Sequence, residues 1–182
     1  MGEHYLENFV QSVFNALVTE GVPVAGGTLV ISGDGRYYNK EAIQVIIKMA
    51  AAAGVGRVWC GTGGLLSTPA MSAVIRARGK GFEPIGGFIL SASHNPGGID
   101  EDFGIKYNCE NGGPAPEKVT NLIFENTKAI KEYKLCESLP AIDLEKPAAY
   151  NITGSKSLTV EVFDCTEDHT DLLKKVFDFE AI

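Results

Sequence analysis

The sequence predicts an α/β domain of three layers, in which helices flank both faces of a mostly parallel, mixed sheet. Stretches with helical spacing of apolar residues alternate with short runs that are almost uniformly apolar. Such runs are typical of strands that are buried on both faces. Because the chain has 182 residues and is 45% hydrophobic, it can bury one sizeable core. We therefore expect one domain, residues 1–182.

The first third of the chain is expected to form two helices and two strands. Apolar side chains recur at helical spacing over residues 3–20, which predicts an amphipathic helix. A strand is expected at residues 28–32. Asn39 is expected to cap a second helix, and Gly54 to end it in the left-handed conformation that glycine adopts readily. The second strand is expected at residues 57–60.

The middle of the chain adds a third helix and a third strand. Thr68 followed by Pro69 is typical of an N-cap and the first helical position, so a helix is expected to run from there to about Arg78. Residues 87–91 predict the strand. Residues 103–108 predict a short extended segment that pairs with the sheet and gives it a mixed character.

The last third is less regular. Pro114 and Pro116 are expected to introduce a fourth helix, whereas residues 135–155 predict an irregular surface segment. A strand at residues 157–163 and a helix at residues 168–177 are expected to follow. The apolar side chains of the fourth helix are Val119, Leu122, Ile123 and Ile130.

Composition and charge argue against several classes of function. The net charge is −7 and the pI is about 5.0, whereas affinity for a nucleic-acid backbone needs clustered lysine and arginine. The four cysteines form no Cys-x-x-Cys pair, so we predict neither a zinc site nor a redox motif. The sequence also contains no secretion signal and no apolar run long enough to span a membrane. We expect a cytoplasmic protein that does not bind nucleic acid.

Residues 91–98 are the most informative segment, and they follow an apolar run directly. Their sequence is Ser91-Ala92-Ser93-His94-Asn95-Pro96-Gly97-Gly98. Backbone N–H groups of a glycine-rich loop can converge on an anion, and α/β folds place ligands at the carboxyl ends of their strands. We interpret Ser93 as a phosphorylated nucleophile. From the loop alone, the alternative is a serine that caps the local backbone.

The serine loop resembles the phosphoserine loop of the phosphoglucomutases, members of the α-D-phosphohexomutase superfamily. Further segments resemble the same family in the same order along the chain, and they are residues 32–42, 64–70, 102–108 and 111–117. The form of the loop is similar to that of the eukaryotic branch, which includes the parafusin-like proteins, rather than to that of the bacterial phosphomannomutases.

The resemblance implies the first domain of a four-domain enzyme. Family members carry an arginine-containing loop before the first helix, and this chain starts after that place. Residues 176–182 resemble the hinge into the second domain. We therefore expect the other three domains to be absent from these residues. The family's metal loop, sugar-recognition loop and distal-phosphate site lie in those domains, so we expect negligible mutase activity from the 182 residues alone.

The resemblance implies three catalytic residues. Ser93 would store the phosphoryl group between two transfers. His94 follows it and is expected either to hydrogen-bond the phosphate or to order the loop. Lys106 lies where the family places a lysine that reaches back to the phosphoryl group. Its expected roles are charge stabilisation and general acid–base catalysis.

Two more residues are expected to join these three in binding substrate. Asn95 lies in the serine loop and is also expected to fix the loop's geometry. Arg36 follows the first strand and is expected to form an ion pair with Asp34. This pair either contacts the substrate or is only structural.

A metal is expected only through the phosphate of Ser93. A phosphoserine carries close to two negative charges, and the resemblance implies that Mg²⁺ binds it with ligands from an Asp-Gly-Asp-Gly-Asp loop of the next domain. The acidic residues 100–102 depart from the family pattern and are assigned no metal. The resemblance further implies glucose 1,6-bisphosphate as intermediate and activator.

The implied function is that of a phosphoglucomutase, which interconverts glucose 1-phosphate and glucose 6-phosphate. The expected partners are a hexose phosphate and the remaining domains of the same chain. Two alternatives stay open at this point. One is a parafusin-like phosphoprotein of calcium-regulated exocytosis, and the other is a truncated scaffold with no function of its own.

Overall fold

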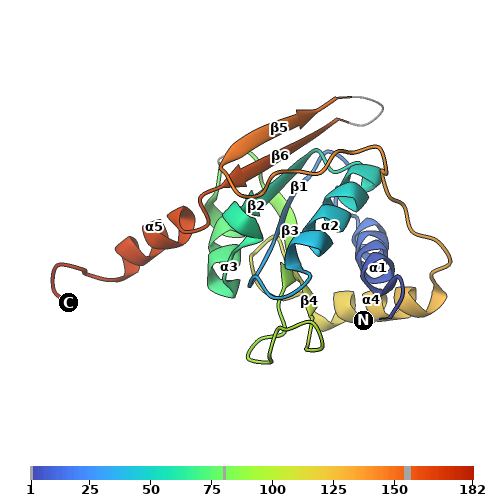
Figure 1. Cartoon of the computed structure of the whole chain (residues 1–182), viewed down its shortest axis with the longest axis horizontal. Helices are drawn as coiled ribbons and strands as arrows, with labels where there is room; N and C mark the ends of the chain where they lie inside the picture. Colours follow the sequence, from blue (N-terminus) through green and yellow to red (C-terminus); the bar gives the residue numbers. More distant parts are fainter. Residues whose placement is uncertain (1, 80, 154–156) are drawn as a thin grey trace.

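The computed structural model describes residues 2–79, 81–153 and 157–182. Within these residues a single mixed sheet has six strands in the order β4-β3-β1-β2-β6-β5 (Figure 1). The inner strands are parallel, and the edge strands β4 and β5 are antiparallel to their neighbours. The strands are β1 (Thr28–Gly33), β2 (Arg57–Gly61), β3 (Pro84–Leu90), β4 (Ile105–Cys109), β5 (Ala148–Ile152) and β6 (Leu158–Phe163).

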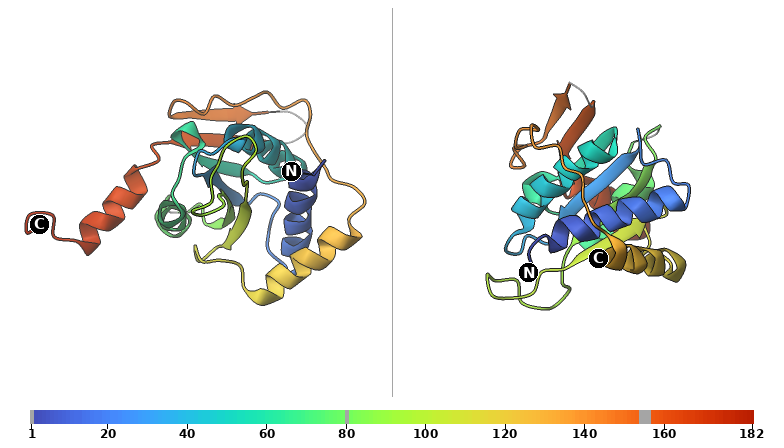
Figure 2. Two further views of the ribbon diagram at one scale, coloured as in Figure 1. Left: turned by 60° about the horizontal axis from the view of Figure 1, so that its bottom comes forward. Right: turned by 90° about the vertical axis from the view of Figure 1, so that its right-hand side faces the viewer.

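Helices cover both faces of this sheet, which confirms the predicted three-layer α/β fold. The helices are α1 (Tyr5–Thr19), α2 (Asn39–Ala53), α3 (Thr68–Ala77), α4 (Glu117–Ala129) and α5 (Glu167–Val176), with a 3-10 turn η1 (Thr62–Gly64). Helices α1, α2 and α4 lie on one face and α3 on the other (Figures 1 and 2).

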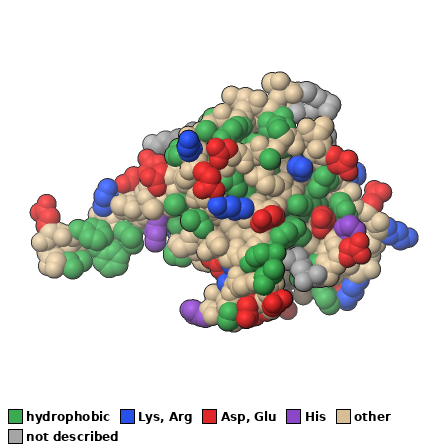
Figure 3. Space-filling model, viewed as in Figure 1, with side chains coloured by type: hydrophobic (Ala, Val, Ile, Leu, Met, Phe, Trp, Pro, Cys, Tyr) green, Lys and Arg blue, Asp and Glu red, His purple; other side chains and the backbone are tan. Residues whose placement is uncertain are grey.

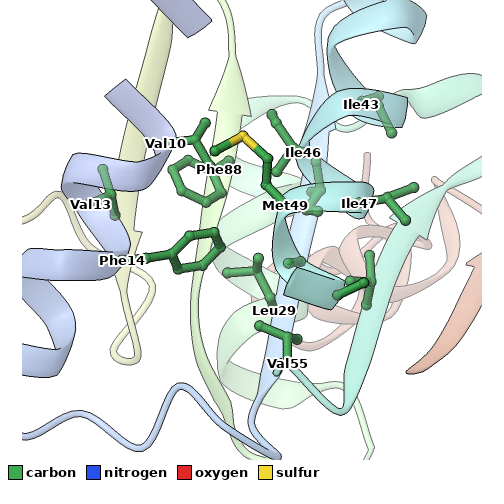
Figure 4. Close-up of a cluster of buried hydrophobic side chains, with 14 of the residues drawn as sticks. Val10, Val13, Phe14, Leu29, Ile43, Ile46, Ile47, Met49, Val55 and Phe88 are labelled. Carbon is green, nitrogen blue, oxygen red and sulfur yellow. The ribbon is translucent and has the colours of Figure 1, made fainter. Parts of the chain in front are cut away.

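The period-two alternation of the strands divides the core between these two faces. Leu29 and Ile31 of β1 pack into the larger cluster beneath α1 and α2, whereas Val30 faces α3. Figure 4 shows Phe88 of β3 between the side chains of α1 and α2. Phe88 is fully buried, and its ring meets Phe14 of α1 edge-on with centroids 5.9 Å apart. Both faces of the sheet are therefore buried, as uniformly apolar strands require.

The order of the strands creates a topological switch point between β1 and β3, at the carboxyl ends of these two strands. From β1 the chain passes through α2 to β2 on one side, and then through α3 to β3 on the other side of β1. The connections leave β1 and β3 in opposite directions, and ligands bind α/β sheets at such a switch point. The loops that follow β1 and β3 are held together there, because the N–H of Asp34 donates to the carbonyl of Leu90 at 3.0 Å.

Two predicted helix caps were wrong by one residue. Ser67, rather than Thr68, is the N-cap of α3, and its hydroxyl accepts a hydrogen bond from the N–H of Ala70. Tyr38, in the left-handed region at φ 68°, precedes α2 where Asn39 was expected as the cap. Asn39 is instead buried, and its side-chain amide donates to the carbonyl of Gly64 at 3.1 Å. Its polar side chain therefore joins α2 to η1.

Residues 135–153, the described part of the segment that was predicted to be irregular, are more ordered than the sequence predicted, and residues 154 and 155 lie outside the described residues. They include β5, and three of their side chains, Leu139, Ile142 and Leu144, are buried in the core cluster. The amide of Gln44 holds the backbone of Ile142 from both sides, donating to its carbonyl at 2.8 Å and accepting from its N–H at 2.9 Å. These apolar residues are too widely spaced for a local period, so only the tertiary fold reveals their burial.

Two other boundaries differ from expectation. Strand β3 begins at Pro84, three residues before the predicted start at residue 87. The prediction missed this start because proline and glycine are uncommon in strands. Ile130 follows the end of α4 and is half-buried, whereas Val119 and Ile123 are buried as predicted.

Helix α5 extends away from the body of the molecule, and none of its residues is buried (Figure 1). It is attached through Arg78 on the α3 side, which pairs with Asp168 at 2.8 Å and with Glu161 of β6 at 3.0 Å. Exposed apolar side chains, among them Phe177 and Phe179, gather at this end of the chain (Figure 3). In the described part of the chain, no helix combines the length and apolarity needed to cross a membrane.

Candidate active site in the serine loop

Ser93 lies in the loop that follows β3, at the switch point of the sheet. Residues 91–104 form this loop, which projects at the bottom of Figure 1. Ser93 is exposed and has a φ of 58°. A left-handed backbone at a non-glycine residue costs roughly 1–3 kcal/mol and persists only where the surrounding structure holds it. Ser93 is therefore held in an unfavourable conformation at the edge where the fold binds ligands.

Lys106 lies directly against the serine hydroxyl. Strand β4 returns antiparallel to β3 and places Lys106 opposite Ile89. The ammonium group of Lys106 donates to Oγ of Ser93 at 3.1 Å. The structure thus brings together two of the three predicted catalytic residues.

His94 is exposed beside Ser93. Among the residues that the structure describes, its imidazole has no hydrogen-bonding or ion-pair partner. Both roles predicted for His94, a phosphate contact and loop ordering, stay predictions.

Ser91 holds the backbone of Ser93 through a hydrogen bond. The hydroxyl of Ser91, which is buried, accepts a hydrogen bond from the N–H of Ser93 at 3.1 Å. The N–H of Ser91 donates to the carbonyl of Gly104 at 2.9 Å, which closes the base of the loop. A Cβ atom at Gly104 would collide with the carbonyl oxygen of Ser91, so only glycine fits there.

Arg36 connects the loop after β1 with the serine loop. It forms the predicted ion pair with Asp34, with Nε to Oδ1 at 3.0 Å and Nη2 to Oδ2 at 2.8 Å. Its Nη1 group donates to the carbonyls of Asp102 at 2.5 Å and Pro96 at 3.3 Å, and Nη2 donates to that of Ser93 at 3.5 Å. All of these acceptors are oxygen atoms of the protein. The predicted contact of Arg36 with substrate therefore stays a prediction.

Asn95 and Asp102 close the serine loop. The side-chain amide of Asn95 donates to the carboxylate of Asp102 at 2.7 Å, and the N–H of Asp102 donates to the carbonyl of Pro96 at 3.1 Å. This arrangement agrees with the expected role of Asn95 in fixing loop geometry. Its predicted contact with substrate stays a prediction.

Sequence reasoning did not identify Ser91, Gly104 or Asp102 as supports of the site. Ser91 carried one usable signal, because it is the first polar residue after an apolar strand. Gly104 and Asp102 carried none, since their roles depend on how the loop folds back on itself.

Asp34, which directly follows β1, has a pKa shifted by its neighbours. Burial by itself raises the pKa of Asp34, but hydrogen bonds from Arg36 and Ser91, together with the charge of Arg36, outweigh that effect. The pKa of Asp34 is therefore below its ordinary value of 3.8. The folded chain thus favours the ionised form of Asp34.

The lowered pKa of Asp34 makes part of the stability depend on pH. A carboxyl group whose pKa is lower in the folded chain than in the unfolded chain stabilises the fold at pH values above its unfolded-state pKa. This contribution is lost as the pH falls through its folded-state pKa. We expect the melting temperature to fall between about pH 5 and pH 2.5, and to fall less over that range in Asp34→Asn. Thermal unfolding followed by circular dichroism would measure this, with the exposed Asp100→Asn as control. Parallel curves for the wild type and Asp34→Asn would contradict it.

The described residues contain no group of three or more His, Cys, Asp or Glu side chains that could hold a metal ion. The oxygen atoms that this loop would offer a hard cation are those of a phosphate on Ser93, and Mg²⁺ prefers oxygen ligands. Binding of Mg²⁺ through a phosphate on Ser93 stays a prediction.

The fold and the site define the class of this protein as an α/β/α domain that presents a serine and a lysine at its switch point. A family model described as phosphoglucomutase/phosphomannomutase, alpha/beta/alpha domain I, matches residues 1–134 of the 182. The chain belongs to this family.

Curated relatives have similar sequences over almost the whole chain. A probable cytoplasmic phosphoglucomutase 2 of Arabidopsis thaliana is 59% identical over 182 residues, and a cytoplasmic phosphoglucomutase of Pisum sativum is 60% identical. Each alignment covers 98% of this chain and 31% of the relative. The chain thus spans about a third of the length of the relatives it matches.

Solved structures have the same fold. The open form of the exocytosis-sensitive phosphoprotein pp63/parafusin from Paramecium, described as a phosphoglucomutase, matches with a TM-score of 0.89 and 41% identity. That match covers 97% of this chain and 32% of the Paramecium chain. A putative phosphomannomutase from Thermus thermophilus matches with a TM-score of 0.68 at 22% identity, which supports the fold alone.

Proposed function

We propose that the chain is the phosphoserine domain of a phosphoglucomutase, which interconverts glucose 1-phosphate and glucose 6-phosphate. The observation that carries this proposal is the hydrogen bond of 3.1 Å between Lys106 and Oγ of Ser93, a residue held at a φ of 58°. The proposal is also supported by the family of the chain and by the names of its relatives. Those relatives are named cytoplasmic, and we propose the same location for this protein.

The proposed reaction transfers the phosphoryl group twice. The bond between phosphorus and Oγ of phosphorylated Ser93 breaks, and a bond to O6 of glucose 1-phosphate forms, while the proton of the O6 hydroxyl replaces the phosphate on Oγ. Glucose 1,6-bisphosphate then reorients, the bond between phosphorus and its O1 breaks, and a new bond to Oγ forms while the proton of Oγ passes to O1, which releases glucose 6-phosphate. The ammonium of Lys106 is placed to offset charge on the transferred group and to pass a proton to or from Oγ.

Ser93 would also supply the contact with a metal. Its phosphate oxygens would hold Mg²⁺, with further ligands from outside the 182 residues, and the ion would offset the negative charge of the phosphoryl group. Because the chain covers only 31% of its relatives, we expect no mutase turnover from these residues alone. The partners we propose are a hexose phosphate and further domains of the whole protein.

The alternative of a phosphoprotein without mutase activity is not favoured. The curated relatives are named phosphoglucomutase, and the Paramecium protein of exocytosis is itself described as a phosphoglucomutase.

A chimera tests the proposed function without any assumption about the ends of the chain. These 182 residues would replace the corresponding segment of the Pisum sativum enzyme, to which they are 60% identical. We expect turnover of glucose 1-phosphate in a coupled assay. Mass spectrometry of the intact protein and of its peptides should detect one phosphate and map it to Ser93. The phosphate should leave the protein on incubation with glucose 1-phosphate. A folded chimera with no turnover and no phosphate on Ser93 would contradict the proposal, and the 182-residue chain alone is the expected inactive control.

A further inference from the structure

We propose that Arg36 is a positioning residue for Ser93. Its guanidinium would hold the serine loop in the one conformation that presents Oγ of Ser93 to Lys106. This inference rests on the proposed function, because it takes Ser93 as the carrier of the phosphoryl group. It assigns Arg36 to the loop and not to the substrate.

Both backbone polar groups of Ser93 are held by hydrogen bonds, and Arg36 binds one of them directly. The carbonyl of Ser93 accepts a hydrogen bond from Nη2 of Arg36 at 3.5 Å. The N–H of Ser93 donates to the hydroxyl of Ser91 at 3.1 Å. Ser91 also helps to lower the pKa of Asp34, and Arg36 binds the carboxylate of Asp34 through Nε and Nη2. Because φ and ψ of Ser93 are set by the peptide groups on either side, these contacts fix its left-handed backbone.

The guanidinium has no N–H group left for a substrate. A guanidinium carries five N–H donors in a fixed plane. Nε donates to Asp34, Nη1 to the carbonyls of Pro96 and Asp102, and Nη2 to Asp34 and the carbonyl of Ser93. Only 6% of the Arg36 side chain is exposed. These contacts occupy all five donors, so a phosphate ligand would first have to displace the loop.

The flat, forked shape of arginine is needed at this position. Its loop acceptors lie on both sides of the turn at residues 98–101, with the carbonyls of Ser93 and Pro96 before it and that of Asp102 after it. Gly97 packs on Arg36 so closely that an added Cβ would lie 2.6 Å from Cβ of Arg36, and its carbonyl accepts from the N–H of Tyr37 at 2.9 Å. Lysine keeps the positive charge beside Asp34 but is a single point donor that cannot span these acceptors.

The first test measures the loop itself in the 182-residue chain. Amide hydrogen exchange followed by NMR reports how often the N–H of Ser93 is released. In Arg36→Lys we expect this exchange to become about tenfold faster or more, while exchange of the β1 amides stays unchanged. Ser91→Ala removes the acceptor of the same N–H and should speed its exchange as well. If Arg36→Lys does not fold, Arg36→Gln, which also lacks the five-donor guanidinium, takes its place in the same measurement.

The second test separates positioning from substrate binding in the chimera. For Arg36→Lys we expect kcat to fall roughly 10- to 100-fold, the scale of a misplaced reacting group, with KM within about twofold. A substrate ligand would instead raise KM. Arg78→Lys is a matched control, because Arg78 also forms a partly buried ion-pair network, with Glu161 and Asp168 on the α3 side. It should lower the melting temperature without changing kcat.

The outcomes distinguish this proposal from the proposed function. Unchanged exchange of the Ser93 amide in the Arg36 variant, or a raised KM with unchanged kcat in that variant, would overturn the role of Arg36. A chimera of the unaltered chain without turnover would overturn the proposed function instead. Hydrogen exchange would still decide whether Arg36 holds the loop.

Discussion

Ser93→Ala in the chimera is expected to abolish mutase turnover, with a loss of roughly 10⁴- to 10⁶-fold in kcat, the scale seen when a nucleophile is removed. Alanine keeps the Cβ atom, so the backbone of the loop at φ 58° bears the same steric cost as before. Only Oγ, the atom that would carry the phosphoryl group, is lost. The coupled assay measures the rate, and mass spectrometry should find no phosphate in the loop.

A second serine provides the control for this substitution. Ser138 is exposed, in the segment before β5, and Ser138→Ala should leave turnover and phosphorylation unchanged. Full activity in Ser93→Ala would mean that the serine loop identifies the ancestry of the chain but takes no part in its chemistry.

Lys106→Met is expected to lower kcat by roughly 10²- to 10³-fold, the scale for loss of one charged group at the reacting atoms. Methionine fills similar space along the strand but carries no ammonium group to approach Oγ of Ser93. Because Lys106 is exposed and β4 is held to β3 by its backbone, the melting temperature should change little. Steady-state kinetics and thermal unfolding would measure the two effects.

Two matched variants sharpen the Lys106 result. Lys106→Arg retains a positive charge and should recover part of the lost rate. Lys118→Met removes an exposed lysine whose contact is a surface ion pair with Glu20, and it should have no effect on kcat. If kcat of the Lys106→Met chimera stays within threefold of the wild-type value, the ammonium group is not needed for phosphoryl transfer. Loss of one catalytic contact should lower kcat by at least about tenfold.

The sequence predicted the layers of the fold because helices and strands have periods that a local pattern reveals. The uniformly apolar residues of β1 and β3 predicted a sheet buried on both sides, and the structure confirms it. Prediction failed where a side chain acts across the fold. Asn39 has the right type for a helix cap but is buried against η1, and Ile142 has its backbone held by Gln44, 98 residues away.

For the site, sequence alone determined the serine loop and its place after a strand, since proline, glycine and serine specify a turn through local sterics. Only the tertiary structure decided what surrounds Ser93. The approach of Lys106 depends on the antiparallel pairing of β4 with β3, and the grip of Arg36 depends on β1 lying beside β3. Local sequence specifies where a turn falls, but contacts between strands arise from burial of the whole sheet, and no short pattern encodes them.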